Sequence, residues 1–214
     1  LPLNDAPPTM PPPALGRGYI TFGCFNNVAK LNPQSVFIWS EVLKAVPDSC
    51  LVLKYKEMFN EPFVHAHYMD MFAHYGIPAE RVRLLTEQLS FVEHLAAYRD
   101  IDIALDPFPF NGSTTTFEAL WMGIPVVTLA GHSMVARWGA SMLRRVGLSS
   151  LVAQLPGDYV QIAARLAADL PRLTAMRADL RNQVAKSPLC DHRRRAKQLD
   201  RVFKYMWRAW CAQT

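Results

Sequence analysis

A run of small polar residues, Asn111 to Thr116, separates two apolar segments in the stretch LDPFPFNGSTTTFEALWMGIPVVTLAG. The apolar segments are typical of strands, and the residues that follow the polar run are typical of a short helix. A helix start presents unpaired backbone amides and about half a unit of positive charge, which suits a phosphate group. Gly112 would let an anion approach the backbone, and the hydroxyls of Ser113, Thr114 and Thr115 would add donors. The run therefore predicts an anion site.

The same segment also has a purely structural interpretation. Ser and Thr are preferred helix N-caps, and Thr115 with Glu118 has the spacing of a capping box. Glu118 has an alternative role, because its two carboxylate oxygens could each accept a hydrogen bond from the cis-diol of a ribose. The sequence leaves both interpretations open.

Three residues outside this run are further candidates. Lys30 follows the first predicted strand in FNNVAK, where its ammonium would meet phosphates held at the helix start, or would be an ordinary solvated lysine. Asn27, in the same loop, has the residue type of a turn. His94 lies in the first turn of a helix that Ser90 opens with a capping box; it would contact a base or phosphate, or be a partly buried helix residue.

Strands and helices must alternate to bring these side chains together. Apolar segments predict strands at 19–25, 50–55, 81–85, 101–106, 124–130 and 151–153. Amphipathic segments predict helices at 32–47, 61–75, 90–98, 114–122, 135–146, 157–184 (broken, or two helices) and from 191 onwards. Strands that are apolar on both faces and separated by single helices predict an α/β fold with a parallel sheet between helical layers. Ligands bind such sheets beyond the carboxyl ends of the strands, where the candidate loops lie.

Composition sets the outer limits of this interpretation. The chain has 214 residues, half of them apolar, which is enough for a domain with a substantial core over residues 19–190. Residues 1–18 contain Pro-Pro and Pro-Pro-Pro runs and predict a linker or arm, because proline lacks an amide donor. The four cysteines show neither zinc-site nor disulfide spacing. No apolar run approaches the roughly 20 residues that cross a bilayer, so we expect a soluble, intracellular protein.

The formal charge of +5 comes from a basic tail. Residues 191–214 would suit an anionic partner, but Leu199, Phe203, Met206 and Trp210 form an apolar stripe at helical spacing. This pattern predicts an amphipathic helix packed on the domain, with its basic residues in solvent. Nucleic acid is not expected as a partner, because no recognition motif accompanies the charge.

Several of these segments occur in the order found in one enzyme family. FGCFNNVAKLNP, HLAAYRDIDIALDPFPFNGSTTTFEALWMGIPVVTLAG and RWGASMLRRVGL resemble the carboxyl-terminal half of the O-GlcNAc transferase family, which includes plant SPINDLY-like and bacterial members. The resemblance covers most of residues 19–210. It implies a GT-B glycosyltransferase, in which two Rossmann-like domains face each other across a cleft behind tetratricopeptide repeats. This chain would be the second domain, which holds the nucleotide-sugar donor.

The resemblance also implies roles for individual residues. Lys30 would neutralise the leaving diphosphate with Asn27 beside it, Gly112, Ser113, Thr114 and Thr115 would bind the diphosphate, Glu118 would take the ribose, and His94 would lie against the uracil. The implied reaction transfers a sugar from UDP-GlcNAc to a Ser or Thr hydroxyl of a protein, in the cytoplasm and without a metal or other cofactor. The acceptor would bind through the missing upstream domain and repeats, no membrane partner is expected, and this fragment alone would be nearly inactive.

Two other functions stay open at this point. The sequence differs from the animal members of the family at Asn27, Phe91, Ala97, Ser113 and Glu118, which permits a degenerate, non-catalytic domain that acts as a protein scaffold. Another GT-B enzyme, such as a sugar-nucleotide epimerase or a lipid-sugar transferase, is the second alternative. A dinucleotide oxidoreductase is disfavoured, because GCFNNVAK replaces the Gly-x-Gly-x-x-Gly that such enzymes place after the first strand.

Overall fold

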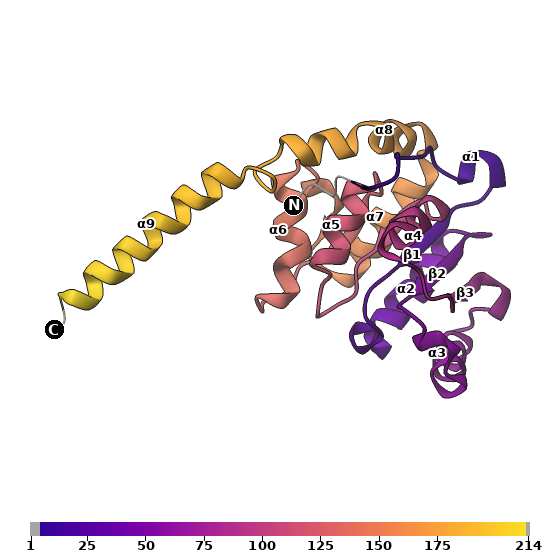
Figure 1. The fold of residues 1–214 in the computed structure, drawn as a ribbon. Coiled ribbons are helices and arrows are strands. Elements are labelled where there is room, and N and C mark those ends of the chain that lie inside the picture. The colour runs from indigo at the N-terminus through magenta and orange to yellow at the C-terminus, as the bar shows by residue number, and fades with distance from the viewer. Residues whose placement is uncertain (1–4, 213–214) are drawn as a thin grey trace.

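The computed structural model describes residues 5–212, which form a six-stranded sheet flanked by helices, with one long helix projecting from it (Figure 1). All strand pairs are parallel, as the sequence predicted. The strands are β1 (Thr21–Cys24), β2 (Cys50–Lys54), β3 (Val82–Leu85), β4 (Ile103–Leu105), β5 (Val126–Leu129) and β6 (Val152–Ala153).

The strands lie in the order β3-β2-β1-β4-β5-β6. From β1 the chain adds strands toward one edge, then crosses back and adds the remaining strands toward the other edge. Phe22 of β1 therefore pairs with Leu51 of β2 on one side and with Ile103 of β4 on the other. The point where the order reverses, between β1 and β4, is where open α/β sheets leave a crevice for a ligand.

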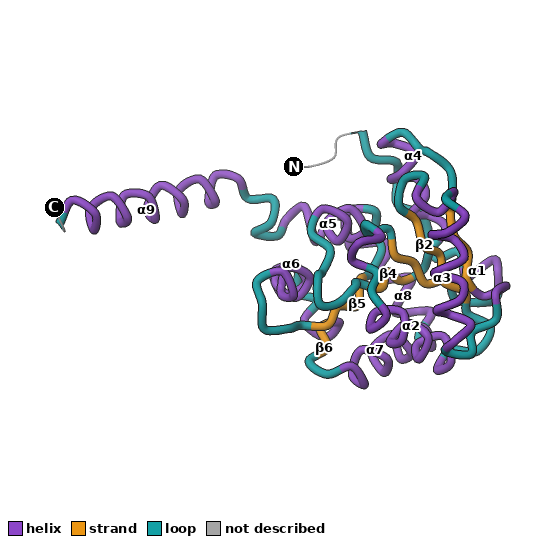
Figure 2. Tube along the Cα trace, turned by 90° about the horizontal axis from the view of Figure 1, so that it is seen from below, coloured by secondary structure: helices purple, strands orange, loops and turns teal. Residues whose placement is uncertain are grey.

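The helices cover both faces of the sheet. The α2 helix packs against α3 and α7, and α5 packs against α8; Figure 2 shows α2 and α7 side by side. The helices are α1 (Ala14–Arg17), α2 (Pro33–Ala45), α3 (Pro62–His74), α4 (Phe91–Ala96), α5 (Thr114–Trp121), α6 (Trp138–Arg145), α7 (Pro156–Ala168), α8 (Leu170–Lys186) and α9 (His192–Cys211).

Local sequence signals explain where several helices begin. The Asn32 side chain accepts a hydrogen bond from the Ser35 amide and caps α2, with Pro33 at its first position. Ser90 opens α4 with the predicted capping box. Asp169 caps α8, so the predicted 157–184 segment is two helices and not one broken helix.

One strand is less buried than predicted. Val82 of β3 is buried, but Arg83 is exposed and the next two residues are half-buried. The cause is position, because β3 is an edge strand, whereas β1, β4 and β5 lie inside the sheet and are buried throughout. The expectation of strands apolar on both faces thus holds for the interior of the sheet.

The proline-rich arm lies along the domain and is not a free linker over the residues that the structure describes. Some of its carbonyl groups accept hydrogen bonds from two arginines of α8. Arg177 donates to Met10 O at 3.0 Å, and Arg181 donates to Pro7 O at 2.6 Å. Arg177 is 1% exposed, so the arm covers a charge that would otherwise face solvent.

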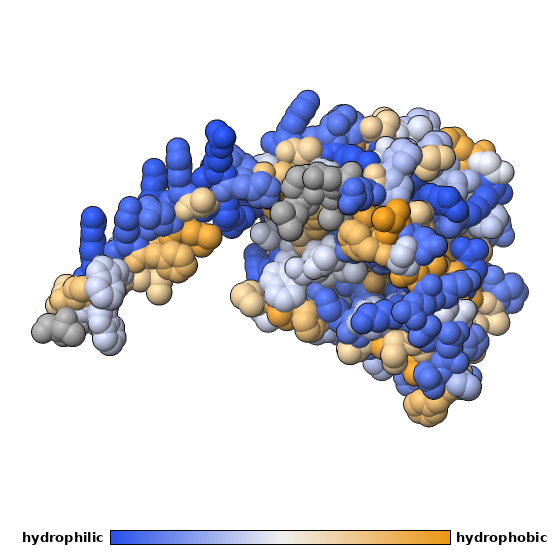
Figure 3. All heavy atoms as spheres, in the orientation of Figure 1, coloured by the Kyte–Doolittle hydropathy of each residue, from blue (hydrophilic) through white to orange (hydrophobic). Residues whose placement is uncertain are grey.

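The basic tail forms the predicted helix, but the prediction that this helix packs on the domain is wrong for the described residues. No described residue of α9 is buried, and the helix points away from the sheet (Figure 1). Its apolar stripe lies along one side and its basic side chains along the other (Figure 3). Trp210 is 63% exposed. The amphipathic pattern correctly predicted a helix with one apolar side. In this structure that side does not pack against the domain.

Among residues 5–212, no helix has the length and apolar character needed to cross a membrane.

Candidate functional site

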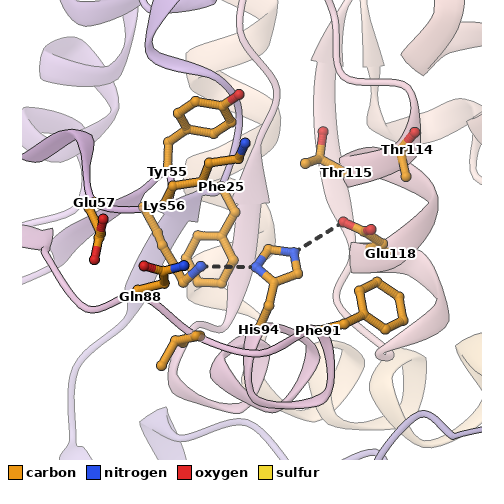
Figure 4. Close-up of a pocket in the computed structure, with 12 residues that line it drawn as sticks. Phe25, Tyr55, Lys56, Glu57, Gln88, Phe91, His94, Thr114, Thr115 and Glu118 are labelled. Carbon is orange, nitrogen blue, oxygen red and sulfur yellow. Dashed lines mark hydrogen bonds and ion pairs between the residues drawn. The ribbon is translucent and has the colours of Figure 1, made fainter.

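A cavity of about 450 Å³ opens beyond the carboxyl ends of the strands. Figure 4 shows Thr114, Thr115 and Glu118 on one side of it, with His94 and Phe25 in the middle. The opposite side comes from the loops after β2 and β3. The lining residues are Phe25, Lys54, Tyr55, Lys56, Glu57, Gln88, Leu89, Phe91, His94, Thr114, Thr115 and Glu118.

The start of α5 is held from below by Asp106, a residue that the sequence analysis did not select. This buried carboxylate accepts hydrogen bonds from the Gly112 amide at 2.7 Å, the Thr128 hydroxyl at 2.6 Å and the Thr116 hydroxyl at 3.3 Å. Burial raises the pKa of Asp106 from 3.8 to about 6, against the lowering effect of these hydrogen bonds and of the Lys30 charge.

The prediction that Gly112 itself presents a donor to an anion needs correction, because its amide is already bonded to Asp106 and the residue is buried. Ser113 and Thr114 are exposed, and no side chain caps this end of α5. The first amides of a helix have no partner within it, so the donors available to a ligand begin after Gly112. An anion at this helix start would therefore meet donors that begin one residue later than predicted.

The alternative capping box of Thr115 and Glu118 does not form. Ser113 is the N-cap, and the Thr115 hydroxyl donates instead to Oδ1 of Asn26 at 2.7 Å. The Glu118 side chain turns toward the cavity, where its Oε2 lies 3.2 Å from Nε2 of His94. The structure therefore supports the ligand-facing interpretation of Glu118 over the capping one.

Lys30 reaches the start of α5 from the loop after β1. Its Nζ donates to the backbone oxygen of Asn111 at 3.0 Å and lies 4.3 Å from the centre of the Phe110 ring. Burial lowers the pKa of the Lys30 ammonium, while the carboxylate of Asp106 raises it. Lys30 does not line the cavity, but its ammonium lies next to the residues that open α5.

Asn27 takes the structural role. Its Oδ1 accepts a hydrogen bond from the Ala29 amide at 2.9 Å and caps the short 3-10 turn that carries Lys30. The neighbouring Asn26 is buried and orients Thr115. In this structure Asn27 thus shapes the loop and does not line the cavity.

His94 lies between a cation and a carboxylate. Its Nδ1 is 3.0 Å from Nζ of Lys54, and its Nε2 is 3.2 Å from Oε2 of Glu118 (Figure 4). An ammonium only donates hydrogen bonds, so Nδ1 accepts from Lys54 and Nε2 carries the proton that is donated to Glu118. The tautomer and ring orientation of His94 are therefore fixed from both ends.

Lys54 is the main cavity residue that the sequence analysis missed. It ends strand β2 and is 4% exposed, which is unusual for a lysine. Burial lowers the pKa of Lys54, while the charges of Glu118 and Glu87 raise it. The available signal was a lysine at the end of an otherwise apolar strand, since strand ends in such a sheet face the ligand crevice.

The arrangement offers three kinds of contact along one cavity. Open amides at Thr114 and Thr115 and the Thr114 hydroxyl suit phosphate oxygens, with the Lys30 ammonium beside them. The Glu118 carboxylate suits a diol, and the aromatic and polar groups beyond His94 suit a planar ring. Among residues 5–212, no group of three or more His, Cys, Asp or Glu side chains is placed to hold a metal ion.

The comparison with known protein families agrees with this geometry. Residues 13–199 match the family described as glycosyl transferase family 41. The chain belongs to this glycosyltransferase family. This membership argues against the alternative of an epimerase or an enzyme of another class.

Curated relatives cover nearly the whole chain. The probable UDP-N-acetylglucosamine-peptide N-acetylglucosaminyltransferases SPINDLY of Solanum lycopersicum and Arabidopsis thaliana are each 40% identical over 210 residues, which is 98% of this chain. Those residues are 22% and 23% of the two relatives. The chain thus spans about a fifth of the length of the curated relatives that it matches.

Solved structures show the same fold. A mutant of the O-GlcNAc transferase of Thermobaculum terrenum matches with a TM-score of 0.90 and 35% identity, over 99% of this chain and 40% of that one. HepE of Anabaena, solved with UDP and glucose, matches with a TM-score of 0.60 and 15% identity, over 87% of this chain and 50% of that one. The domain is therefore a Rossmann-like member of the GT-B architecture, as the resemblance implied.

Proposed function

We propose that this chain is the donor-binding domain of a protein O-glycosyltransferase and that its donor is a nucleoside-diphosphate sugar of the UDP-GlcNAc type. The proposal rests on the position of the Lys30 ammonium beside the start of α5, whose first amides have no partner within the helix. Nζ of Lys30 lies 3.0 Å from the backbone oxygen of Asn111, just before that helix. The relatives' printed names, which specify UDP-N-acetylglucosamine and a peptide, support the choice of donor and acceptor.

The donor would lie along the cavity with its diphosphate at Thr114 and Thr115, its ribose at Glu118 and its base beyond His94. In the reaction, the acceptor hydroxyl oxygen forms a bond to the anomeric carbon as the bond from that carbon to the diphosphate oxygen breaks. The electron pair leaves with the diphosphate. Lys30 and the positive end of α5 stabilise this charge, so no metal ion is required for that role.

The hydroxyl proton passes to a base outside this chain, and the acceptor binds mainly to the part of the enzyme upstream. The alternative of a non-catalytic scaffold is less well supported, because the cavity is open and its charged groups converge. The proposal includes a cytoplasmic location.

Titration calorimetry tests the proposal directly. UDP is expected to bind the chain, and uridine, which keeps the base and ribose but lacks both phosphates, is expected to bind at least about tenfold more weakly. No binding of UDP at millimolar concentration, or equal affinities for UDP and uridine, would contradict the proposal.

A further inference from the structure

We propose that Lys54 selects the nucleobase of the donor by donating a hydrogen bond to a ring carbonyl oxygen, so that the site accepts oxo bases and rejects amino bases. Oxo bases here are uracil and guanine, and amino bases are cytosine and adenine. The inference rests on the proposed function, because it assumes that a nucleoside diphosphate occupies the cavity.

The two sides of the cavity fix which part of the ligand Lys54 would meet. The donors for phosphate, at Thr114 and Thr115, lie on one side, and Glu118 follows one turn further along α5 (Figure 4). A ribose joins phosphate to base, so a base attached to a ribose at Glu118 must extend past His94. Lys54 lies there, within 3.0 Å of the far nitrogen of the His94 ring.

This side of the cavity offers an aromatic face on which a base would stack. The Phe25 ring lies in the middle of the cavity with Nζ of Lys54 5.8 Å from its centre, whereas Phe91 lies on the Glu118 side of His94 (Figure 4). An aromatic ring can stack on any of the bases and does not by itself discriminate between them. Polar groups at the edge of the ring must therefore supply the selectivity.

The Lys54 ammonium has donors left for a ligand. It has three N–H groups, and His94 accepts one of them. Within residues 5–212 no carboxylate forms an ion pair with it, although Glu118 and Glu87 are near enough to favour its charge. Because the residue is 4% exposed, water cannot freely satisfy the remaining donors, and a ligand acceptor gains more there than at the surface.

An ammonium cannot accept a hydrogen bond, which makes the contact selective. Uracil and guanine present a carbonyl oxygen where cytosine and adenine present an amino group. A carbonyl oxygen would accept a hydrogen bond from a free N–H group of Lys54. An amino group would instead place its own N–H donors opposite those of Lys54 in a buried site, and neither set would have an acceptor. A site that holds such unpaired groups rejects the wrong ligand strongly.

Binding of four nucleoside diphosphates tests this inference. The four ligands form a pyrimidine pair, UDP and CDP, and a purine pair, GDP and ADP. In the pair that contains the tightest ligand of the four, we expect the oxo-base nucleotide to bind at least about tenfold more tightly than the amino-base nucleotide. Lys54→Met keeps the side-chain length and an apolar character that suits a buried strand end. In this variant the preference within that pair is expected to fall to about threefold or less.

Two controls and the pattern of the four affinities separate the possible causes of a negative result. Inorganic pyrophosphate, which occupies the phosphate positions alone, should bind the wild type and Lys54→Met equally. Lys44→Met, at an exposed lysine of α2, should leave the base preference unchanged. A merely structural role of Lys54 in supporting His94 would weaken all four nucleotides together and leave their ratios intact.

Equal binding within both pairs, or a preference that survives in Lys54→Met, would overturn the inference and leave the proposed function standing. Failure of pyrophosphate and all four nucleotides to bind would instead contradict the proposed function, and the inference with it.

Discussion

The polar side chains around the cavity are already hydrogen-bonded to one another. Lys54, His94 and Glu118 form a row in which each holds the next, with both separations at or below 3.2 Å. A carboxylate has room for more than one donor, so Glu118 can keep its contact with His94 and still accept from a diol. The ligand would therefore meet oriented groups and would not have to order them, which lowers the entropic cost of binding.

Gly112 gives a test of how closely this region is packed. A Cβ atom on Gly112 would lie 2.9 Å from Oδ1 of Asp106 and closer still to the Thr116 hydroxyl. Gly112→Ala must therefore push these groups apart, and we expect the free energy of unfolding to fall by roughly 1–3 kcal/mol. Chemical denaturation measures this change.

The matched control is Gly157→Ala in the first turn of α7, where a Cβ atom would meet nothing within 4 Å. That substitution should leave stability unchanged or raise it by less than about 1 kcal/mol. Equal effects of the two substitutions would show that the packing around Gly112 is looser than the structure indicates.

The sequence predicted some of the residues that line the cavity and did not predict others. His94 and Glu118 could be selected because each lies within the first five residues of a helix at the expected edge of the sheet. Asn27 lies in the loop after β1 but caps its own turn, and a local hydrogen bond of this kind has no separate sequence signal. The hydrogen bonds of Asp106 could not be predicted, because its partners Gly112, Thr116 and Thr128 lie 6, 10 and 22 residues along the chain and meet only in the fold.

At the scale of secondary-structure elements, Asp106 joins the end of β4 to the start of α5 and, through Thr128, to β5. Its pKa is raised from 3.8 to about 6, so ionisation costs the folded state more than the unfolded state. The folded protein holds the extra proton between these values, and this contribution to stability is full below about pH 4 and lost as pH rises through about 6. The loss is on the order of 3 kcal/mol.

Urea denaturation between pH 4 and pH 7 checks this expectation with Asp106→Asn, which cannot ionise. The unfolding free energy of the wild type relative to the variant should fall by about 3 kcal/mol as pH rises across that window. Asp70→Asn, at an exposed position of α3, should show no comparable slope. If the difference in unfolding free energy between the wild type and Asp106→Asn did not change with pH, Asp106 would ionise as easily in the folded protein as in the unfolded chain.

The elements themselves were largely predictable, because they depend on short-range signals. Asn32 before Pro33 and the Ser90 capping box marked helix starts that the structure confirms. Thr115 with Glu118 shows the same spacing without the cap, because Asn26 from another loop takes the Thr115 hydroxyl. Where a distant residue and a local one compete for the same hydrogen bond, the sequence spacing alone does not predict which of them forms it.

At the scale of the whole molecule, two terminal segments behave in opposite ways. The proline-rich arm was expected to be a linker, yet Arg177 and Arg181 hold its carbonyl groups against α8. The amphipathic α9 was expected to pack on the domain, yet its apolar side chains are exposed. Composition describes what a segment can bury, but the surface that receives it is a property of the assembled fold.

Deletion of residues 192–214 tests the independence of α9. Since no described residue of this helix is buried, we expect the shortened chain to unfold cooperatively with a midpoint within about 3 °C of the full chain. It should also self-associate less, because a row of exposed apolar side chains is removed. Thermal unfolding by circular dichroism and sedimentation measure these properties.

A longer deletion provides the contrast. Ending the chain at Asp169 removes α8 with its buried residues Leu173, Leu180 and Val184, and is expected to abolish cooperative unfolding. If removal of α9 alone had the same effect, the helix would have to stabilise the domain in a way that its exposed position does not suggest.

The central claim is that the Lys30 ammonium and the open start of α5 together bind a diphosphate. The most direct test is calorimetric titration of the chain with UDP, comparing the wild type, Lys30→Ala and the exposed control Lys44→Ala. The account predicts that UDP affinity falls at least about tenfold in Lys30→Ala, the loss expected for one hydrogen bond to a charged group, and is unchanged in Lys44→Ala. UDP affinity that is the same in Lys30→Ala and the wild type would contradict it.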